Sequence, residues 1–119
     1  MRISVTDLDD DLIHVALAGR MDALGVEKVA IAFTAATATR RALIAVDLAE
    51  VDFVASAALR QFFANARTQQ QRGGLLVLAA PQADVRSVLD ASGVQQVIPV
   101  FGALDEALEA LRQRAPRAP

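Results

Sequence analysis

Two short apolar segments constrain the fold of this chain more than any other feature. Residues 42–48 (ALIAVDL) and 75–80 (LLVLAA) are apolar without the alternation of a half-exposed strand. Such runs are typical of parallel strands that helices cover on both faces. The segment between them predicts an amphipathic helix over residues 56–71, which Gly73-Gly74 terminates. The residues expected on its buried face are Leu59, Phe62, Phe63 and Ala66.

The N-terminal residues predict a β-hairpin followed by a helix. Residues 2–7 and 12–19 both alternate between apolar and polar positions, which is the period of a half-buried strand. The polar turn between them favours antiparallel pairing, with the first strand at an edge of the sheet. Asp22 is a suitable cap for a helix that runs to about Thr39.

The C-terminal part repeats the alternation of strand and helix. Pro81 suits the first turn of a helix that ends at Ser92-Gly93, and residues 97–100 (VIPV) predict a brief edge strand. A last helix begins near Leu104.

The whole pattern predicts an α/β fold with a mixed sheet of four or five strands. Its N-terminal strand is antiparallel, and about four helices pack on the two faces. The expected organisation is one domain over residues 1–112 and a flexible tail over residues 113–119.

Composition excludes several classes of function. The net charge is −2 and the 12 Lys and Arg residues are scattered, which argues against a nucleic-acid partner. No cysteine is present, and the single histidine, His14, is expected to be structural, so no metal site is predicted. No apolar run reaches the roughly 18 residues of a membrane helix, and the charged start is unlike a signal peptide. These features predict a cytoplasmic protein without a membrane partner.

Catalytic signatures are missing as well. The sequence has no phosphate-binding glycine loop, no serine-hydrolase elbow and no zinc-protease motif, so neither an enzyme nor a cofactor is expected. In open α/β sheets, function gathers at the carboxyl ends of the parallel strands. Here that edge comprises 19–22, 47–56 and 79–82. Within it, Ser56 opens a helix, either as an N-cap or as a phosphate acceptor, and both interpretations are compatible with this position.

The order and spacing of several motifs resemble the STAS domain family, and within it the bacterial anti-sigma factor antagonists. The likeness covers roughly residues 2–112. The matching segments are Gly19-Arg20-Met21-Asp22, Val46-Asp47-Leu48, residues 51–59 (VDFVASAAL), 73–78 (GGLLVL) and 85–93 (VRSVLDASG). Two positions depart from the family pattern. Ala55 replaces the Asp that precedes the serine, and Ala58 replaces a Gly.

This resemblance implies a role in partner switching. An antagonist of this family binds an anti-sigma factor that is also a serine kinase of the GHKL type. Phosphorylation of the serine separates the two proteins, and a serine phosphatase restores binding. The resemblance assigns phosphorylation to Ser56. It places the partner-binding surface at Gly19, Asp22, Ser56, Ala57, Ala58 and Leu59.

Two other functions compete with this interpretation. The first is a constitutive STAS interaction module, such as an accessory subunit of a transporter or a signalling scaffold, and Ala55 favours it. The second is a small nucleotide-binding or hydrolytic α/β protein, which the missing phosphate loop and nucleophile–base pair disfavour.

Overall fold

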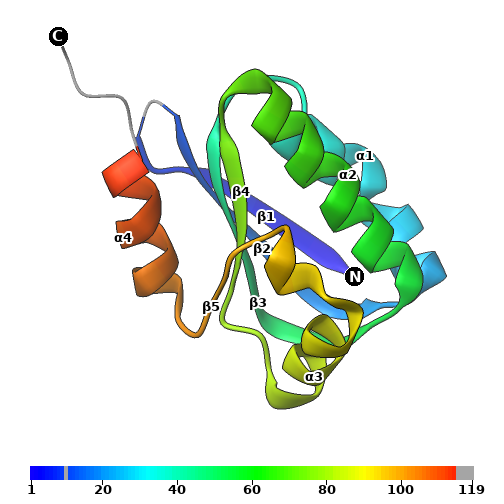
Figure 1. The fold of residues 1–119 in the computed structure, drawn as a ribbon. Coiled ribbons are helices and arrows are strands. Elements are labelled where there is room, and N and C mark those ends of the chain that lie inside the picture. The colour runs from blue at the N-terminus through cyan, green and yellow to red at the C-terminus, as the bar shows by residue number, and fades with distance from the viewer. Residues whose placement is uncertain (10, 115–119) are drawn as a thin grey trace, which may run out of the picture.

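An N-terminal hairpin and three strand–helix–strand units build one five-stranded sheet (Figure 1). The structure is a computed structural model that describes residues 1–9 and 11–114. Its strands are β1 (Arg2–Asp7), β2 (Leu12–Met21), β3 (Leu43–Val54), β4 (Leu75–Ala79) and β5 (Val100–Phe101). Its helices are α1 (Ala23–Thr37), α2 (Ser56–Arg72), α3 (Ala83–Ser92) and α4 (Leu104–Arg114), with a 3₁₀ turn η1 (Val94–Gln96).

The strand order follows the chain order, β1-β2-β3-β4-β5. Only β1 is antiparallel to its neighbour; the other three pairings are parallel. Consecutive parallel strands joined by helices are the geometry that the two apolar runs predict. The predicted fold class is therefore confirmed, with β1 at one edge and β5 at the other.

The helices divide unequally between the two faces of the sheet. Helices α1, α2 and α3 cover one face, where the larger hydrophobic core lies. Helix α4 lies on the other face, where Ala107 and Leu111 pack against β2, β3 and β4 (Figure 1). Strands β3 and β4 are consequently buried on both sides, as their unbroken apolar runs indicate.

Strand β3 is longer than the sequence predicts, because residues 49–54 continue it instead of forming a turn. This extension pairs with the end of β2, and the pairing register shifts twice along it. The shifts bring Leu48, Val51 and Val54 to the buried face at a spacing of three residues. A strand normally buries every second residue, so this bulged segment lacks the expected sequence pattern.

The segment before β5 also corrects a prediction, because only Val100 and Phe101 of this region form a strand. The carbonyl of Val94 accepts the N–H groups of Val97 and Ile98 at 2.9 and 2.8 Å, which holds residues 94–98 in a tight turn. Pro99 has no N–H to donate to a strand.

Two element boundaries also differ from the predictions. Helix α3 begins at Ala83, two residues after Pro81. Helix α4 extends to Arg114, into the segment expected to be a tail, and residues 115–119 lie outside the described residues. Within the described part of the chain, none of the helices combines the length and the apolar character needed to span a membrane.

Candidate functional site

The ends of β2 and β3 bring the two predicted site segments together. Met21 pairs with Val54, and the N–H of Ala55 donates to the carbonyl of Met21 at 3.0 Å. The turn between β2 and α1 therefore lies beside the start of α2. Asp22 and Ser56, 34 positions apart in the sequence, begin neighbouring helices at the same end of the sheet.

Ser56 is the first residue of α2 and its side chain is exposed. Ala55 occupies the N-cap position, and its carbonyl accepts the N–H groups of Ala58 and Leu59 at 3.0 and 3.3 Å. No side chain caps this helix. This corrects the interpretation of Ser56 as an N-cap, because a residue inside the first turn cannot fill that position. The Ser56 hydroxyl is left on the surface without a capping role.

The start of α2 also lacks negative charge. Its first turn contains no acidic residue, and its N-cap side chain is a methyl group. The first N–H groups of a helix have no partner within the helix, and they form the positive end of the helix dipole. An anion on Ser56 would therefore lie next to uncompensated positive charge.

Asp22 caps α1, as the sequence predicts. Its Oδ1 accepts the N–H of Gly25 at 2.8 Å, and its Oδ2 accepts the Arg20 Nε–H at 3.2 Å. The hydrogen bond from the Gly25 N–H is the main cause that lowers the pKa of Asp22; desolvation opposes it, and the Arg20 charge lowers the pKa further. Asp22 therefore presents a carboxylate at the surface, although both of its oxygens already have partners.

Gly25 allows this cap to form. A Cβ at this position would lie 2.1 Å from the carbonyl oxygen of Arg20, so a larger residue would push the helix away from β2. Only glycine fits here because the end of β2, at Arg20, lies so close to the first turn of α1.

Arg20 and Phe53 form a further contact that sequence analysis missed. The Arg20 guanidinium carbon lies 3.8 Å from the centre of the Phe53 ring, and Phe53 is 37% exposed. The two residues are register partners on β2 and β3. Their pairing could have been found only if β3 had been extended through residues 49–54. The contact holds an aromatic ring at the surface beside Asp22.

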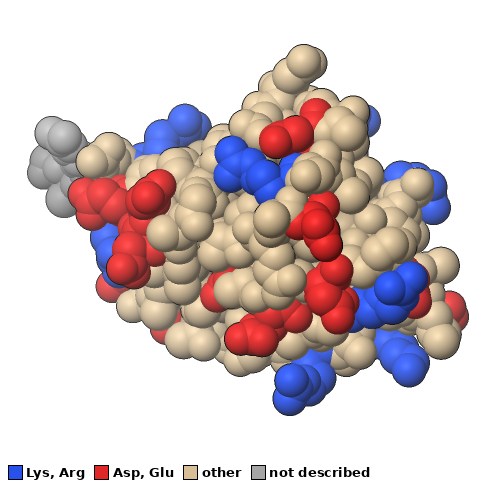
Figure 2. Space-filling model, turned by 90° about the horizontal axis from the view of Figure 1, so that it is seen from below, with Lys and Arg blue, Asp and Glu red and all other residues tan. Residues whose placement is uncertain are grey.

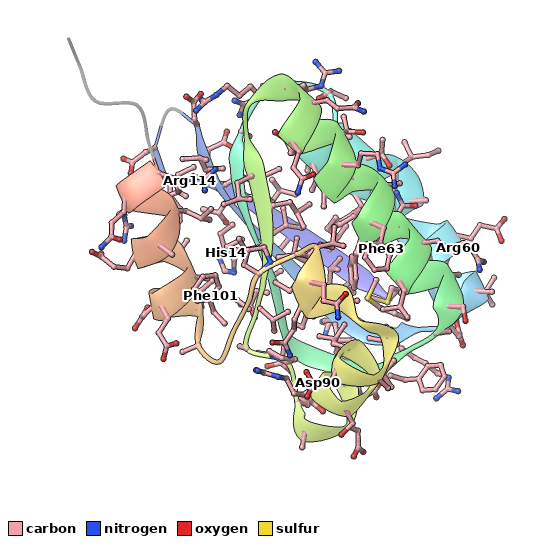
Figure 3. The ribbon with its side chains drawn as sticks, viewed as in Figure 1. His14, Arg60, Phe63, Asp90, Phe101 and Arg114 are labelled. Carbon is pink, nitrogen blue, oxygen red and sulfur yellow. The ribbon has the colours of Figure 1, made fainter. Side chains whose placement is uncertain are left out.

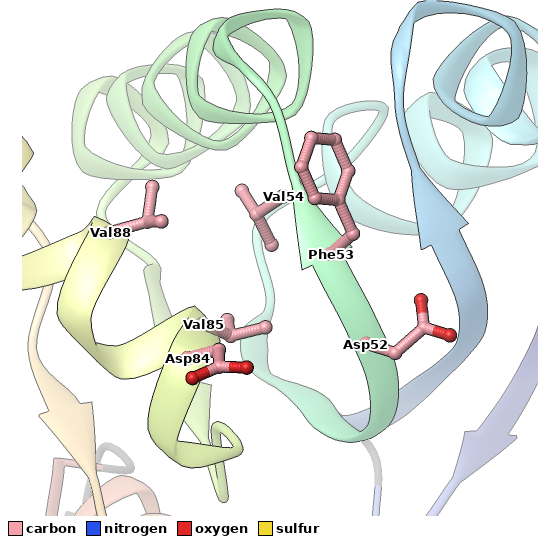
Figure 4. Close-up of a pocket in the computed structure, with 6 residues that line it drawn as sticks. All are labelled: Asp52, Phe53, Val54, Asp84, Val85 and Val88. Atoms are coloured by element: carbon pink, nitrogen blue, oxygen red, sulfur yellow. The ribbon is translucent and has the colours of Figure 1, made fainter.

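A shallow groove of about 130 Å³ adjoins this ring, between the end of β3 and helix α3 (Figure 4). Asp52 and Asp84 lie on its two sides, and carboxylates spread across this end of the molecule in Figure 2. The remaining lining residues are Phe53, Val54, Val85 and Val88. The groove joins segments 30 residues apart, and no sequence motif indicated it.

The other residues predicted to bind a partner differ in accessibility. Gly19 and Ala57 are partly exposed, and Leu59 is partly buried against the core. Ala58 is fully buried, which corrects the expectation for this residue, because its methyl group can influence a partner only through the packing of α2.

His14 lies away from this site, on the side of the sheet that faces α4 (Figure 3). Its Nε2 is 2.9 Å from Asp47 Oδ2, and both side chains are mostly buried. Asp47 Oδ1 also accepts the N–H of Ala49 at 3.0 Å. The pair links β2 to β3, in keeping with the structural role predicted for His14. Across residues 1–9 and 11–114, no cluster of three or more potential metal ligands occurs.

The chain is similar in sequence to proteins of known family. The family model of the STAS domain matches residues 3–107. A Bordetella bronchiseptica protein whose name describes it as the anti-sigma factor antagonist BtrV is 27% identical over 117 residues. The match covers 98% of this chain and all of the relative.

Solved structures share the fold. An anti-sigma factor antagonist from Mycobacterium paratuberculosis superimposes with a TM-score of 0.83 at 24% identity, over 93% of each chain. Unphosphorylated SpoIIAA, an anti-sigma factor antagonist, gives 0.78 at 18% identity, over 97% of this chain and all of that chain. The phosphorylated form of the Bacillus protein SpoIIAA gives 0.66 at 18% identity, over 93% of this chain and all of that chain. At these identities the structures establish the architecture alone.

Proposed function

The chain belongs to the STAS domain family, and we propose that it is an anti-sigma factor antagonist controlled by phosphorylation of Ser56. In this proposal it binds an anti-sigma factor that is also a GHKL-type serine kinase, and binding releases a sigma factor or another target. The kinase phosphorylates Ser56 with ATP, which ends the complex, and a serine phosphatase restores it. The protein acts by binding in the cytoplasm and catalyses no reaction itself.

The observation that carries this proposal is the position of Ser56. Its hydroxyl is exposed in the first turn of α2, it has no capping role, and it lies beside the Asp22 turn. An acceptor hydroxyl must reach the active site of a kinase without local unfolding, and this position meets that requirement. The Bordetella relative is named as an anti-sigma factor antagonist, and SpoIIAA has a phosphorylated form, which supports this class of function and not the particular serine.

Phosphorylation is compatible with the fold. A phosphoserine carries about −1.5 to −2 charges at neutral pH. At Ser56 it would meet the free N–H groups at the start of α2, whose first turn contains no acidic residue. A negative charge at a helix N-terminus typically stabilises the helix by about 0.3–1 kcal/mol. The phosphorylated protein should therefore remain folded.

The same charge opposes the complex. A partner packed against the neutral hydroxyl would have to accept a dianion close to Asp22. Taking such a charge out of water without a counter-charge costs several kcal/mol. The phosphate thus weakens binding through desolvation and through repulsion by any facing carboxylate.

Ala55 favours the constitutive interaction module as the second candidate function. The family pattern has an acid at this position, and its absence removes a group that could position the serine in a kinase site. Without phosphorylation, the same surface would bind its partner permanently.

The test is phosphate transfer by the copurified kinase and ATP, followed by intact-mass measurement. We expect one phosphate on the wild type and none on Ser56→Ala. Ser87→Ala provides a matched control, since Ser87 is an exposed serine on α3, and it should be phosphorylated like the wild type. Phosphate on Ser56→Ala would place the acceptor elsewhere. No phosphate on a wild type that binds this kinase would favour the constitutive module.

A further inference from the structure

The outward face of α1 is unusually apolar for a surface helix. Only two of its residues, Glu27 and Lys28, are charged. Leu24 is 61% exposed and Ile31 is 88% exposed, while Ala32 and Ala35 are exposed on the same helix. A helix that covers a sheet normally presents polar side chains to solvent. Large exposed aliphatic side chains gathered on one element mark an interaction surface.

The exposed residues form a stripe along α1. Residues seven apart on a helix lie within about 20° of each other around the axis, so Leu24 and Ile31 share one line. Each residue advances about 100°, which puts Glu27 on one flank of this line and Lys28 on the other. The stripe is therefore apolar at both ends, with one acid and one base on opposite sides of its middle.

We propose that this stripe binds α1 of a second copy of the chain, about a two-fold axis parallel to the helix. With this symmetry, the Glu27 side of one stripe lies next to the Lys28 side of the other. Leu24 then meets Leu24 of the second copy, Ile31 meets Ile31, and Glu27 lies beside Lys28 of the second copy in two symmetric pairs. The surface is complementary to itself in this orientation, as a two-fold interface must be.

The charges also select the orientation. A two-fold axis perpendicular to the helices would make them antiparallel. The Glu27 sides of the two stripes would then lie next to each other, and so would the Lys28 sides. Glu27 would then face Glu27, and Lys28 would face Lys28, which places like charges together. The positions of Glu27 and Lys28 therefore favour a second copy of the chain as the partner of the stripe, with the two helices parallel. This inference does not depend on the proposed function.

The size of the stripe predicts a weak dimer. Stable interfaces bury roughly 800 Å² on each partner, more than one face of a four-turn helix provides. The dimer should therefore dissociate on dilution into the low micromolar range.

Cross-linking tests the orientation directly, because the chain contains no cysteine and a single substitution introduces the only thiol. In a parallel pair, residue 31 meets its own copy, so Ile31→Cys should form a disulfide dimer under mild oxidation. Val97→Cys is the control, since Val97 is also exposed (47%) but lies in the turn before β5. Cross-linking of Ile31→Cys no faster than of Val97→Cys would overturn the parallel dimer.

Charge reversal tests whether the stripe binds a second copy of the chain. In sedimentation velocity, Glu27→Lys and Lys28→Glu should each weaken self-association about tenfold, because each creates two like-charge contacts. The double variant restores both pairs and should dimerise within about threefold of the wild type. Failure of the double variant to recover would contradict the proposal. So would a wild type that stays monomeric at roughly 0.5 mM, on the order of 100 times the low micromolar range. A different protein that binds α1 while the chain remains monomeric would also overturn it.

Discussion

Ser56 and Asp22 both lie at the start of a helix, but only the Asp22 side chain caps its helix. Asp22 is the cap of α1, and its two oxygens accept hydrogen bonds from Gly25 and Arg20. Ser56 follows a cap position filled by Ala55, so its hydroxyl has no such task. A partner that contacts Asp22 must compete with existing bonds, whereas a kinase that acts on Ser56 displaces no capping bond. The two residues are therefore suited to different roles: Asp22 to fixing the shape of the surface, and Ser56 to changing its charge when it is phosphorylated.

The lowered pKa of Asp22 makes a prediction for the pH dependence of stability. Folding lowers the pKa below its ordinary value of 3.8, so the ionised carboxylate stabilises the fold above that pH. The contribution is lost as pH falls through the folded pKa. Asp22→Asn retains an oxygen that can cap the helix but has no charge. We expect the wild type to have the higher melting temperature at pH 6, and the difference to disappear near pH 2.

Melting curves of the two proteins over this pH range provide the measurement. A difference that stays constant from pH 6 to pH 2 would show that the charge of Asp22 does not contribute. Circular dichroism at each pH would verify that both proteins are folded at the start of the experiment.

Helix α2 buries polar side chains that its apolar spacing did not predict. The sequence assigns Leu59, Phe62, Phe63 and Ala66 to one face, but Leu59 and Phe63 are only partly buried. Asn65 and Gln69 are buried instead. Apolar periodicity cannot identify such positions, because an amide is buried only where the tertiary structure supplies its hydrogen-bond partners.

Gln69 is the clearest case, since it connects α2 to the loop between α1 and β3. Its Oε1 accepts the N–H of Ala42 at 2.9 Å, and its Nε2 donates to the carbonyls of Thr37 and Arg40, both at 2.7 Å. One side chain therefore binds three backbone groups, the carbonyl of the last residue of α1 and two groups of the loop. This contact fixes the entry into β3, the strand that ends at the candidate site.

Gln69→Leu should destabilise the protein strongly. An unsatisfied buried polar group costs about 1–3 kcal/mol. Leucine at position 69 would leave three backbone groups without their hydrogen-bond partner. Urea unfolding should give a loss in the free energy of unfolding of at least about 2 kcal/mol. Gln70→Leu is the matched control on the same helix, because Gln70 is exposed, and it should change stability by less than about 0.5 kcal/mol. Equal effects of the two substitutions would contradict the role of Gln69.

At the scale of the molecule, the apolar runs of β3 and β4 predict most of the architecture. They require cover on both faces, and the chain supplies it with α1, α2 and α3 on one side and α4 on the other. Chain order then places Asp22 and Ser56 at the same end of the sheet, so this part of the site could be predicted. The Arg20–Phe53 contact and the groove could not, because both depend on the bulged end of β3.

The arrangement of layers also predicts which aromatic residue stabilises the core. Phe62 is fully buried and packs edge-to-face on Phe33 of α1, with ring centres 6.0 Å apart. Phe63, the next residue, lies at the margin of the core and is only partly buried. Phe62→Ala should lower the free energy of unfolding by about 3–5 kcal/mol, and Phe63→Ala by clearly less. A larger effect of Phe63→Ala in urea unfolding would mean that α2 is rotated from its position in this structure.

If phosphate on Ser56 ends the complex, the kinase partner must bind the two forms of the protein with different affinities. Calorimetric titration of the unphosphorylated and the fully phosphorylated wild type gives both dissociation constants. Ser56→Ala, incubated with kinase and ATP in the same way, controls for phosphate elsewhere. We expect the phosphorylated form to remain folded and to bind at least about 100-fold more weakly, which corresponds to about 2.7 kcal/mol. Equal affinities for the two forms would contradict it.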